Sequence, residues 1–197
     1  MYIASNVKDP IAVLTMPNRA KRTALHLACM MSEANVALVE FLTLACPDAA
    51  GLTDKDGMTP LHHALTVEGP VLAVIEDLTG VCPAAVCVRA TNTGSTPLHL
   101  ALQNSTYADE TVATDILKDL VASNPLALQL QDAVAGNTPL HAAVVAGRRI
   151  KDIKLMFKKY TFAAAVANAK GETPYKIAKA LKAEKDVLKL LKPTEMM

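Results

Sequence analysis

Histidine offers the most chemistry in this 197-residue chain, because its side chain can act as a base or bind a metal near neutral pH. Four of the five histidines recur at wide intervals, which argues against a shared catalytic or metal site. They are His26, His62, His99 and His141. The fifth, His63, directly follows His62, and we expect it to be structural or to face solvent.

The remaining reactive side chains form no recognised catalytic pattern. Cys29, Cys46, Cys82 and Cys87 include no C-x-x-C pair, so we interpret them as reduced packing residues rather than disulfide partners or metal ligands. No Gly-rich phosphate loop, H-E-x-x-H or G-x-S-x-G motif is present. Nor does any carboxylate have a spaced partner that suggests acid–base catalysis. We therefore expect that the protein is not an enzyme and that it binds no small-molecule substrate, metal or cofactor.

The four recurring histidines lie in copies of one eight-residue phrase, which starts at residues 22, 58, 95 and 137; a fifth, altered copy starts at residue 172. Its Thr-Pro step predicts the start of a helix, because the Thr hydroxyl can cap free amides and Pro needs no donor in the first turn. Four copies have a glycine two residues before the threonine, which suits a tight turn with positive φ. These glycines are Gly57, Gly94, Gly136 and Gly171.

A second helix is predicted in each unit by apolar pairs spaced three residues apart. The pairs are Val39 with Leu42, Ile75 with Leu78, Leu117 with Leu120, and Ile153 with Met156. A connector follows each pair, and in three units it begins with proline, which ends the helix. Two such small amphipathic helices cannot bury their apolar faces alone, so we predict that the units stack.

The phrase T-P-L-H-x-A, with its threonines 36, 37, 42 and 35 residues apart, resembles the ankyrin repeat. The resemblance implies an all-α solenoid of stacked helix-turn-helix units with short hairpin turns. It also implies that the recurring histidines hydrogen-bond each hairpin turn to its neighbour. We expect a single repeat domain, with repeats near 18–50, 51–87, 88–129, 130–165 and 166–192. An N-terminal capping segment, 1–17, would precede it, and a tail, 193–197, would follow.

The third repeat and both ends depart from the pattern. The third repeat is five residues longer than the second between its Thr and its Pro, and we expect the extra length in a loop around Asn104–Asp109. That loop is either functional or a tolerated surface excursion. The first repeat has Lys21 where the others have glycine, and the last has Tyr175 and Lys176 in place of Leu-His. We expect polar ends and a complete, capped array.

Charge is divided unevenly along the chain. Residues 148–192 hold 13 Lys and Arg against four acids, whereas residues 1–147 hold seven against 14. The spacing suggests a continuous lysine stripe in the last repeat, made of Lys176, Lys179, Lys182, Lys185, Lys189 and Lys192. The stripe is either a solvated cap or a landing patch for an acidic protein, a phosphate or an anionic membrane. Nucleic acid is disfavoured because stacking aromatics are nearly absent.

The resemblance implies a non-enzymatic protein-interaction scaffold or adaptor that binds a partner protein on its concave surface. In the hairpins, the candidate protein-binding residues are Lys55, Asp56, Met58, Asn92, Thr93, Ser95, Val134, Ala135, Asn137, Ala169, Lys170 and Glu172. At the ends of the first helices, they are Met30, Met31, Thr66, Val67, Gln103 and Asn104. The two methionines are either an adaptable apolar contact or are covered by the N-terminal segment.

Two alternatives stay open: an anion- or membrane-surface-binding adaptor that uses the Lys-rich end, and a targeting module of a larger protein. The start of the chain lacks the features of a signal peptide, and no run of about 18 apolar residues suggests membrane insertion. We therefore expect an intracellular monomer, cytoplasmic or nuclear.

Overall fold

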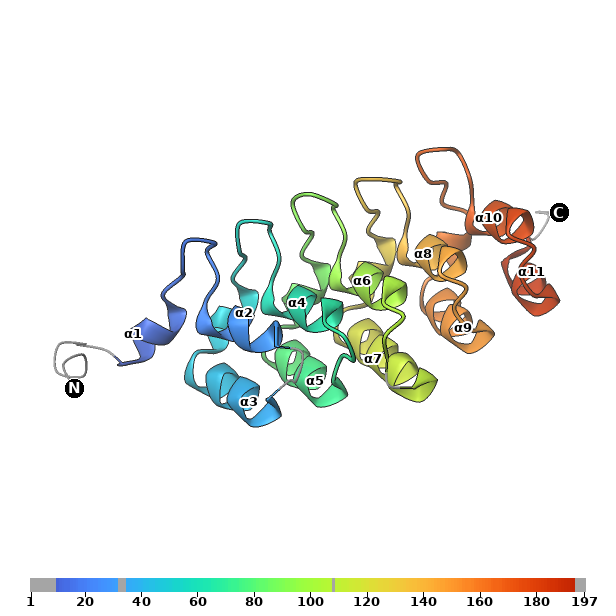
Figure 1. Ribbon diagram of the computed structural model, residues 1–197. Helices are drawn as coiled ribbons and strands as arrows, with labels where there is room; N and C mark the ends of the chain where they lie inside the picture. The colour runs from blue at the N-terminus through green and yellow to red at the C-terminus, as the bar shows by residue number, and fades with distance from the viewer. Residues whose placement is uncertain (1–9, 32–34, 108, 194–197) are drawn as a thin grey trace.

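The computed structural model describes residues 10–31, 35–107 and 109–193. Within these residues it contains eleven α-helices, four 3-10 helices and no strand. The helices form an elongated stack of two rows, and hairpin turns project beyond one of the rows (Figure 1). This arrangement confirms the predicted all-α solenoid.

The inner row consists of the short helices that follow the repeated Thr. They are α2 (Ala24–Cys29), α4 (Pro60–Thr66), α6 (Pro97–Gln103), α8 (Pro139–Val145) and α10 (Pro174–Ala180). In the first four, the Thr side chain accepts a backbone N–H and the histidine three residues later caps the threonine amide. The predicted helix starts are therefore confirmed. Gly57 and Gly94 have φ values of 71° and 63°, as the predicted turns require.

The outer row consists of the second helix of each repeat. Its members are α3 (Val36–Ala45), α5 (Leu72–Val81), α7 (Glu110–Ser123), α9 (Ile150–Lys159) and α11 (Lys185–Leu191). The connectors that follow the first four form the 3-10 helices η1 (Pro47–Gly51), η2 (Pro83–Cys87), η3 (Pro125–Gln129) and η4 (Thr161–Ala164). A short helix, α1 (Pro10–Thr15), precedes the first repeat.

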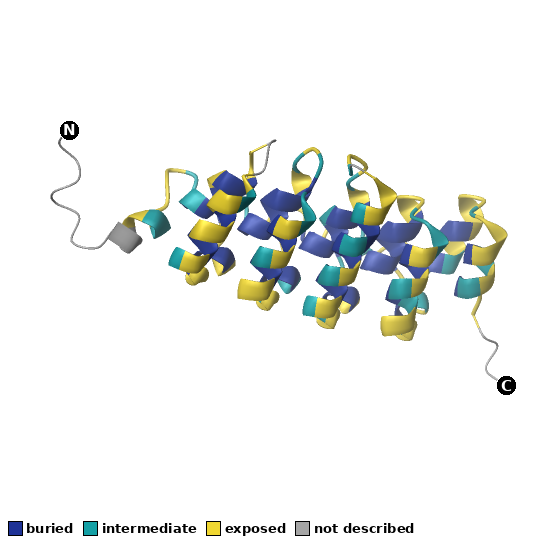
Figure 2. Cartoon of the chain, turned by 90° about the horizontal axis from the view of Figure 1, so that it is seen from below, coloured by how far each residue is buried: buried dark blue, intermediate teal, exposed yellow. Residues whose placement is uncertain are grey.

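The core lies between the two rows and continues from one repeat to the next (Figure 2). Leucines of the repeated phrase are fully buried in it, among them Leu25, Leu61, Leu98 and Leu140. The four apolar pairs predicted for the outer helices are buried as well. Each repeat therefore completes the core of its neighbours, as stacking requires.

The predicted position of the extra length in the third repeat is only partly right. The loop between α6 and α7 has six residues, against five between α4 and α5. Most of the insertion instead lengthens α7, which has 14 residues where α5 has 10. The Asp109 side chain accepts hydrogen bonds from the amides of Thr111 and Val112, so α7 begins one turn earlier.

The two ends of the stack also differ from expectation. The lysines do not form one helical stripe, because α10 ends at Ala180 and Lys182 lies in a turn with φ of 54° before α11 begins. The N-terminal end is not polar either, since Phe41 and Leu44 of α3 are exposed.

Candidate protein-interaction surface

The hairpin turns form a continuous edge of the molecule because single backbone hydrogen bonds join each turn to the next (Figure 1). The bonds run from Lys55 N to Ala20 O (3.0 Å), Thr91 N to Asp56 O (2.7 Å), Ala133 N to Thr93 O (2.9 Å) and Ala169 N to Ala135 O (2.9 Å). Adjacent hairpins are therefore held in register, and side chains at their tips can present one surface.

The four recurring histidines connect the repeats, as the resemblance implies. In each of them Nδ1 accepts the amide N–H of the threonine three residues earlier, at 3.1 to 3.3 Å. Nε2 faces a backbone carbonyl of the following repeat: Met58 (3.2 Å), Ser95 (3.4 Å), Asn137 (2.9 Å) and Glu172 (3.0 Å), in chain order. Since a backbone N–H can only donate, Nδ1 carries no proton, and Nε2–H donates to the carbonyl.

Burial lowers the pKa of all four of these histidines, for His62 to about 4. The neutral imidazole is therefore the form that joins the repeats near neutral pH. Both ring nitrogens are engaged, so none of the four is available as a base or a ligand. The described residues also contain no group of three or more His, Cys, Asp and Glu side chains that could hold a metal ion.

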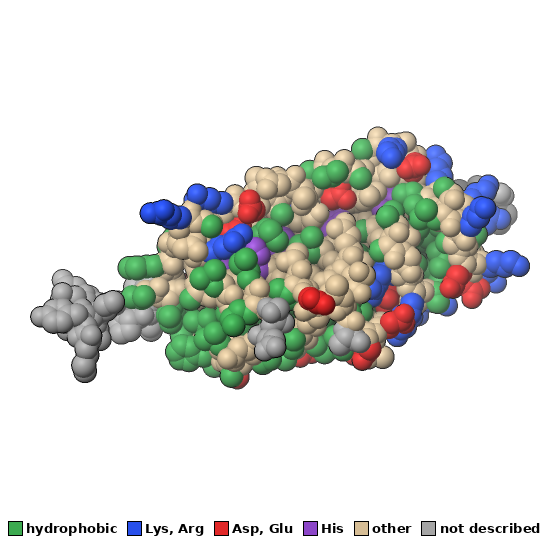
Figure 3. Space-filling model, viewed as in Figure 1, with side chains coloured by type: hydrophobic (Ala, Val, Ile, Leu, Met, Phe, Trp, Pro, Cys, Tyr) green, Lys and Arg blue, Asp and Glu red, His purple; other side chains and the backbone are tan. Residues whose placement is uncertain are grey.

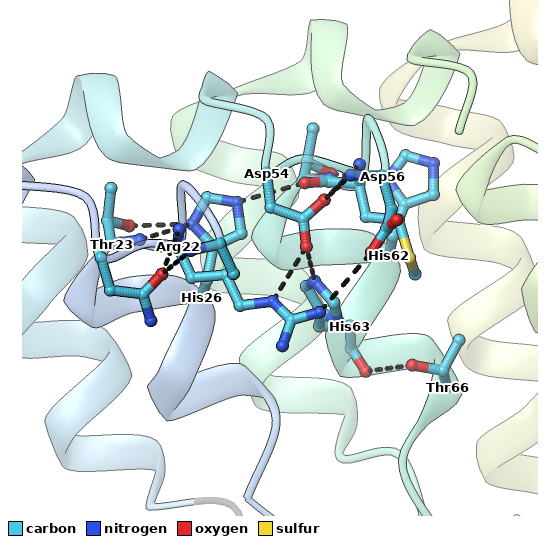
Figure 4. Close-up of polar contacts among 12 residues, drawn as sticks. Arg22, Thr23, His26, Asp54, Asp56, His62, His63 and Thr66 are labelled. Carbon is cyan, nitrogen blue, oxygen red and sulfur yellow. Dashed lines mark hydrogen bonds and ion pairs between the residues drawn. The ribbon is translucent and has the colours of Figure 1, made fainter. Parts of the chain in front are cut away.

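A polar cluster not anticipated from the sequence joins the first hairpin to the second repeat (Figure 4). His63 is buried, and its Nε2 lies 2.9 Å from Oδ2 of Asp54. The Nε of Arg22 donates to the same carboxylate oxygen at 3.0 Å. The other oxygen, Oδ1, accepts the amides of Asp56 and Met58, which closes the second hairpin turn.

The Asp54 carboxylate is a structural anchor rather than a general base. Burial acts to raise its pKa, but the hydrogen bonds from Arg22 and His63 outweigh that effect and lower the pKa to about 2. A carboxylate this acidic, with both oxygens engaged, is a poor proton acceptor near neutral pH. Its partners Arg22 and His63 come from distant positions in the sequence, so spacing alone does not indicate them.

Two neighbouring hollows lie along the ends of the inner helices in the first three repeats. The larger, about 610 Å³, lies between α4 and α6 and includes Thr66, Glu68, Gln103 and Asn104 in its lining. The smaller, about 310 Å³, is lined by Met30, His63, Thr66, Val67 and Glu68. Because Thr66 and Glu68 line both, the hollows form one surface, which we term the inner-helix groove.

The structure brings together most of the helix-end residues predicted to bind a partner. Five of the six line the inner-helix groove; Met31 is exposed but does not line it. Sequence reasoning missed Glu68, Leu65 and Leu100, which line the groove between the predicted positions. Glu68 follows Thr66 by two residues, so extending the predicted set into the loop would have found it.

The predicted hairpin residues divide into exposed and constrained positions. The exposed ones are Lys55, Asn92, Thr93, Val134, Ala169 and Lys170. Half-buried positions are Asp56, Met58, Ala135, Asn137 and Glu172. The position directly before each repeated threonine supplies the carbonyl that faces the preceding histidine, which limits its exposure.

Ser95 is the clear error among the predicted binding residues. We expected it at an exposed turn tip, but its exposed fraction is 6%. Its carbonyl accepts the amide of Ala90 and faces Nε2 of His62, and its own amide donates to Oγ1 of Thr93. These bonds draw the residue into the base of the hairpin, so its side chain is not part of an exposed surface.

All six lysines of the predicted basic patch are exposed, on α10, on α11 and in the segments that follow these helices. The Nζ of Lys176 also donates to the carbonyl of Gly171 at 3.1 Å, so this lysine closes the last hairpin. The structure thus places the lysines at one end of the stack, away from the inner-helix groove (Figure 3).

Comparison with known families agrees with this architecture. Residues 25–114 match the family profile of ankyrin repeats, in three copies. Ankyrin repeats are protein–protein interaction modules and are generally non-enzymatic. A comparison with curated proteins returned no match. Among the described residues, no helix has the length and apolar character needed to span a membrane.

Proposed function

We propose that the chain is a scaffold or adaptor that binds a partner protein through its concave surface, at the inner-helix groove. The observation that carries this proposal is the convergence of Met30, Thr66, Val67, Gln103 and Asn104 on two hollows that share part of their lining. These residues come from three different repeats, so no single repeat forms the groove. A partner would therefore contact residues of three stacked repeats at once rather than a motif within one repeat.

The groove combines apolar and polar groups, which suits a protein ligand. Leu100 and Met30 supply apolar surface, while Glu68 and Gln103 supply charge and hydrogen-bonding groups. Apolar side chains of a partner would gain affinity by desolvation in such hollows, and polar groups at the rim would set orientation.

The proposal is tested by capturing partners with the immobilised chain and identifying them, then measuring the affinity of each for variants. Thr66 and Gln103 are exposed, so a double variant, Thr66→Arg with Gln103→Arg, fills the groove without removing core side chains. We expect at least about tenfold weaker binding, since every 1.4 kcal/mol corresponds to a factor of ten. The matched control, Glu76→Arg, changes an exposed residue of α5 and should bind like wild type.

A second function, an adaptor for anions or membrane surfaces, is favoured by the six exposed lysines at the C-terminal end. Replacing Lys182, Lys185 and Lys189 with Ser separates the two proposals. If the groove holds the partner, these changes should reduce only the salt dependence of the association rate. Full binding by the groove variant, together with loss of binding by the lysine variant, would transfer the function to the basic end.

A further inference from the structure

The first outer helix exposes an apolar face at the N-terminal end of the stack. Leu38, Phe41 and Leu44 of α3 are 37%, 59% and 76% exposed, and their spacing of three residues places them on one side of the helix. We term these three residues the α3 apolar face. In the space-filling view, apolar side chains gather at the lower left, where α3 lies (Figures 1 and 3).

The corresponding positions in later repeats show what this face is built to contact. Leu38 corresponds to Val74 of α5 and Ile116 of α7, and both of these are fully buried. Phe41 corresponds to Asp119 of α7. The carboxylate of Asp119 accepts a hydrogen bond from the hydroxyl of Thr79 on α5, at 2.8 Å. The positions of Leu38 and Phe41 therefore point toward the preceding outer helix. The position of Leu44 is exposed in the later repeats as well, at Gly80, Ala122 and Lys158.

No outer helix precedes α3 among the described residues. Instead α3 packs mainly against α2, α5 and η1, which lie on its other sides. Its first-repeat side chains thus present an apolar helix-packing surface to solvent. Apolar side chains at helix-packing positions are well suited to a second helix of similar shape.

The N-terminal end of the stack combines exposed apolar side chains with no formal net charge, so two such ends can meet without electrostatic repulsion. Of the fifteen large apolar side chains that are exposed in the described residues, nine lie before residue 53. Residues 1–52 contain four Lys and Arg and four Asp and Glu, so this end has no formal net charge. At the other end, 13 basic residues against four acids give residues 148–192 a net charge of +9.

We propose that a second copy of this chain covers the α3 apolar face, so that two copies associate through their N-terminal ends. In a twofold arrangement the same face serves both partners, and the contact closes at a dimer. Two C-terminal ends would repel one another, and a head-to-tail contact would press lysines of α11 against apolar side chains. The inner-helix groove lies on the opposite row of helices, so this dimer would leave it open.

The test is the concentration dependence of the molar mass of the full chain, measured by sedimentation velocity from about 1 µM to about 500 µM. The variant Phe41→Asp with Leu44→Lys places at these positions the residues that α5 and α9 carry there, Asp77 and Lys158. The repeat fold therefore accommodates both changes, and circular dichroism should show unchanged helix content. The control is Phe162→Asp, at an apolar side chain of η4 that is 75% exposed and lies in the fourth repeat.

We expect wild type and the Phe162→Asp control to shift from one copy toward two as concentration rises. The double variant should remain a single copy over the whole range. A monomeric wild type would overturn the proposal, and the face would then be covered by the chain's own N-terminal residues or by another partner. Equal association of the double variant, or growth of wild type beyond two copies, would overturn it as well. Because the groove variants do not alter this face, failure here leaves the proposed function unaffected.

Discussion

Acid should weaken the stack through the histidines that join its repeats. The neutral imidazole of His62 caps the amide of Thr59. Burial lowers the pKa of His62 from 6.5 to about 4. Between these two values the unfolded chain binds a proton that the folded chain does not, so unfolding is favoured as the pH falls. The stabilisation by neutral His62 is fully present above pH 6.5 and is lost progressively toward pH 4.

The size of the effect follows from the two pKa values. Lowering the pH from 7 to 5 should reduce the free energy of unfolding by about 2 kcal/mol through His62 alone. The other three recurring histidines act in the same direction, since burial lowers their pKa too. Asp54 does not affect this comparison. Its pKa is lowered from 3.8 to about 2, so the stability that its carboxylate provides is lost only below about pH 3.8.

The assay is urea denaturation of wild type and His62→Gln at pH 7 and pH 5, followed by circular dichroism. Glutamine at this position can still cap the Thr59 amide but does not titrate. The loss of stability between the two pH values should therefore be about 2 kcal/mol smaller in the variant, with an unchanged dependence of unfolding free energy on urea concentration. Equal losses in the two proteins would refute the role of the buried neutral imidazole.

Three further substitutions test the packing. Leu98→Ala should cost about 2–5 kcal/mol of unfolding free energy, because Leu98 is fully buried, and the denaturation midpoint should fall far more than in Ser95→Ala, which removes only a hydroxyl oxygen. Gly94→Ala should destabilise the third hairpin, since φ is +63° and a Cβ would lie 2.5 Å from a neighbouring backbone nitrogen; an unchanged melting temperature would contradict this. Asp54→Ala should cost about 3 kcal/mol, because it leaves the buried His63 and the half-buried Arg22 without their carboxylate; an unchanged urea denaturation midpoint would show the cluster to be dispensable.

The repeat architecture could be predicted from the sequence because its determinants are local. A Thr-Pro step, a turn glycine and an apolar pair three residues apart each act within one or two helical turns, and each lies where it was predicted. The histidine bonds between repeats could also be anticipated, but only through the family resemblance. Their acceptors are backbone carbonyls, which leave no trace in side-chain identity.

The errors concern features that depend on how the repeats meet. The Asp54 cluster joins side chains 9 and 32 residues away, and no spacing rule indicates that Arg22 and His63 converge. Ser95 was placed at a tip because its backbone bonds, which draw it inward, are invisible in sequence. The lengthening of α7 is not evident from the sequence, because an aspartate is as common in a loop as at the helix cap that Asp109 forms.

The insertion of the third repeat connects these observations to the proposed function. Asn104, which begins the loop before the lengthened α7, donates to the carbonyls of Leu65 and Val67 in the second repeat, at 2.8 and 3.1 Å. The Tyr107 hydroxyl donates to Ala101, and the guanidinium of Arg148, from the fourth repeat, stacks over its ring. The segment is therefore held by the repeats on both sides of it.

A tolerated surface excursion would need no such anchoring. Asn104, Ser105 and Thr106 also line the larger hollow, so the loop between α6 and α7 builds one wall of the inner-helix groove. A wall that is already ordered by hydrogen bonds costs a partner less conformational entropy on binding than a free loop would. Of the two interpretations that the sequence left open for this segment, the contacts favour a functional loop, positioned before any partner arrives.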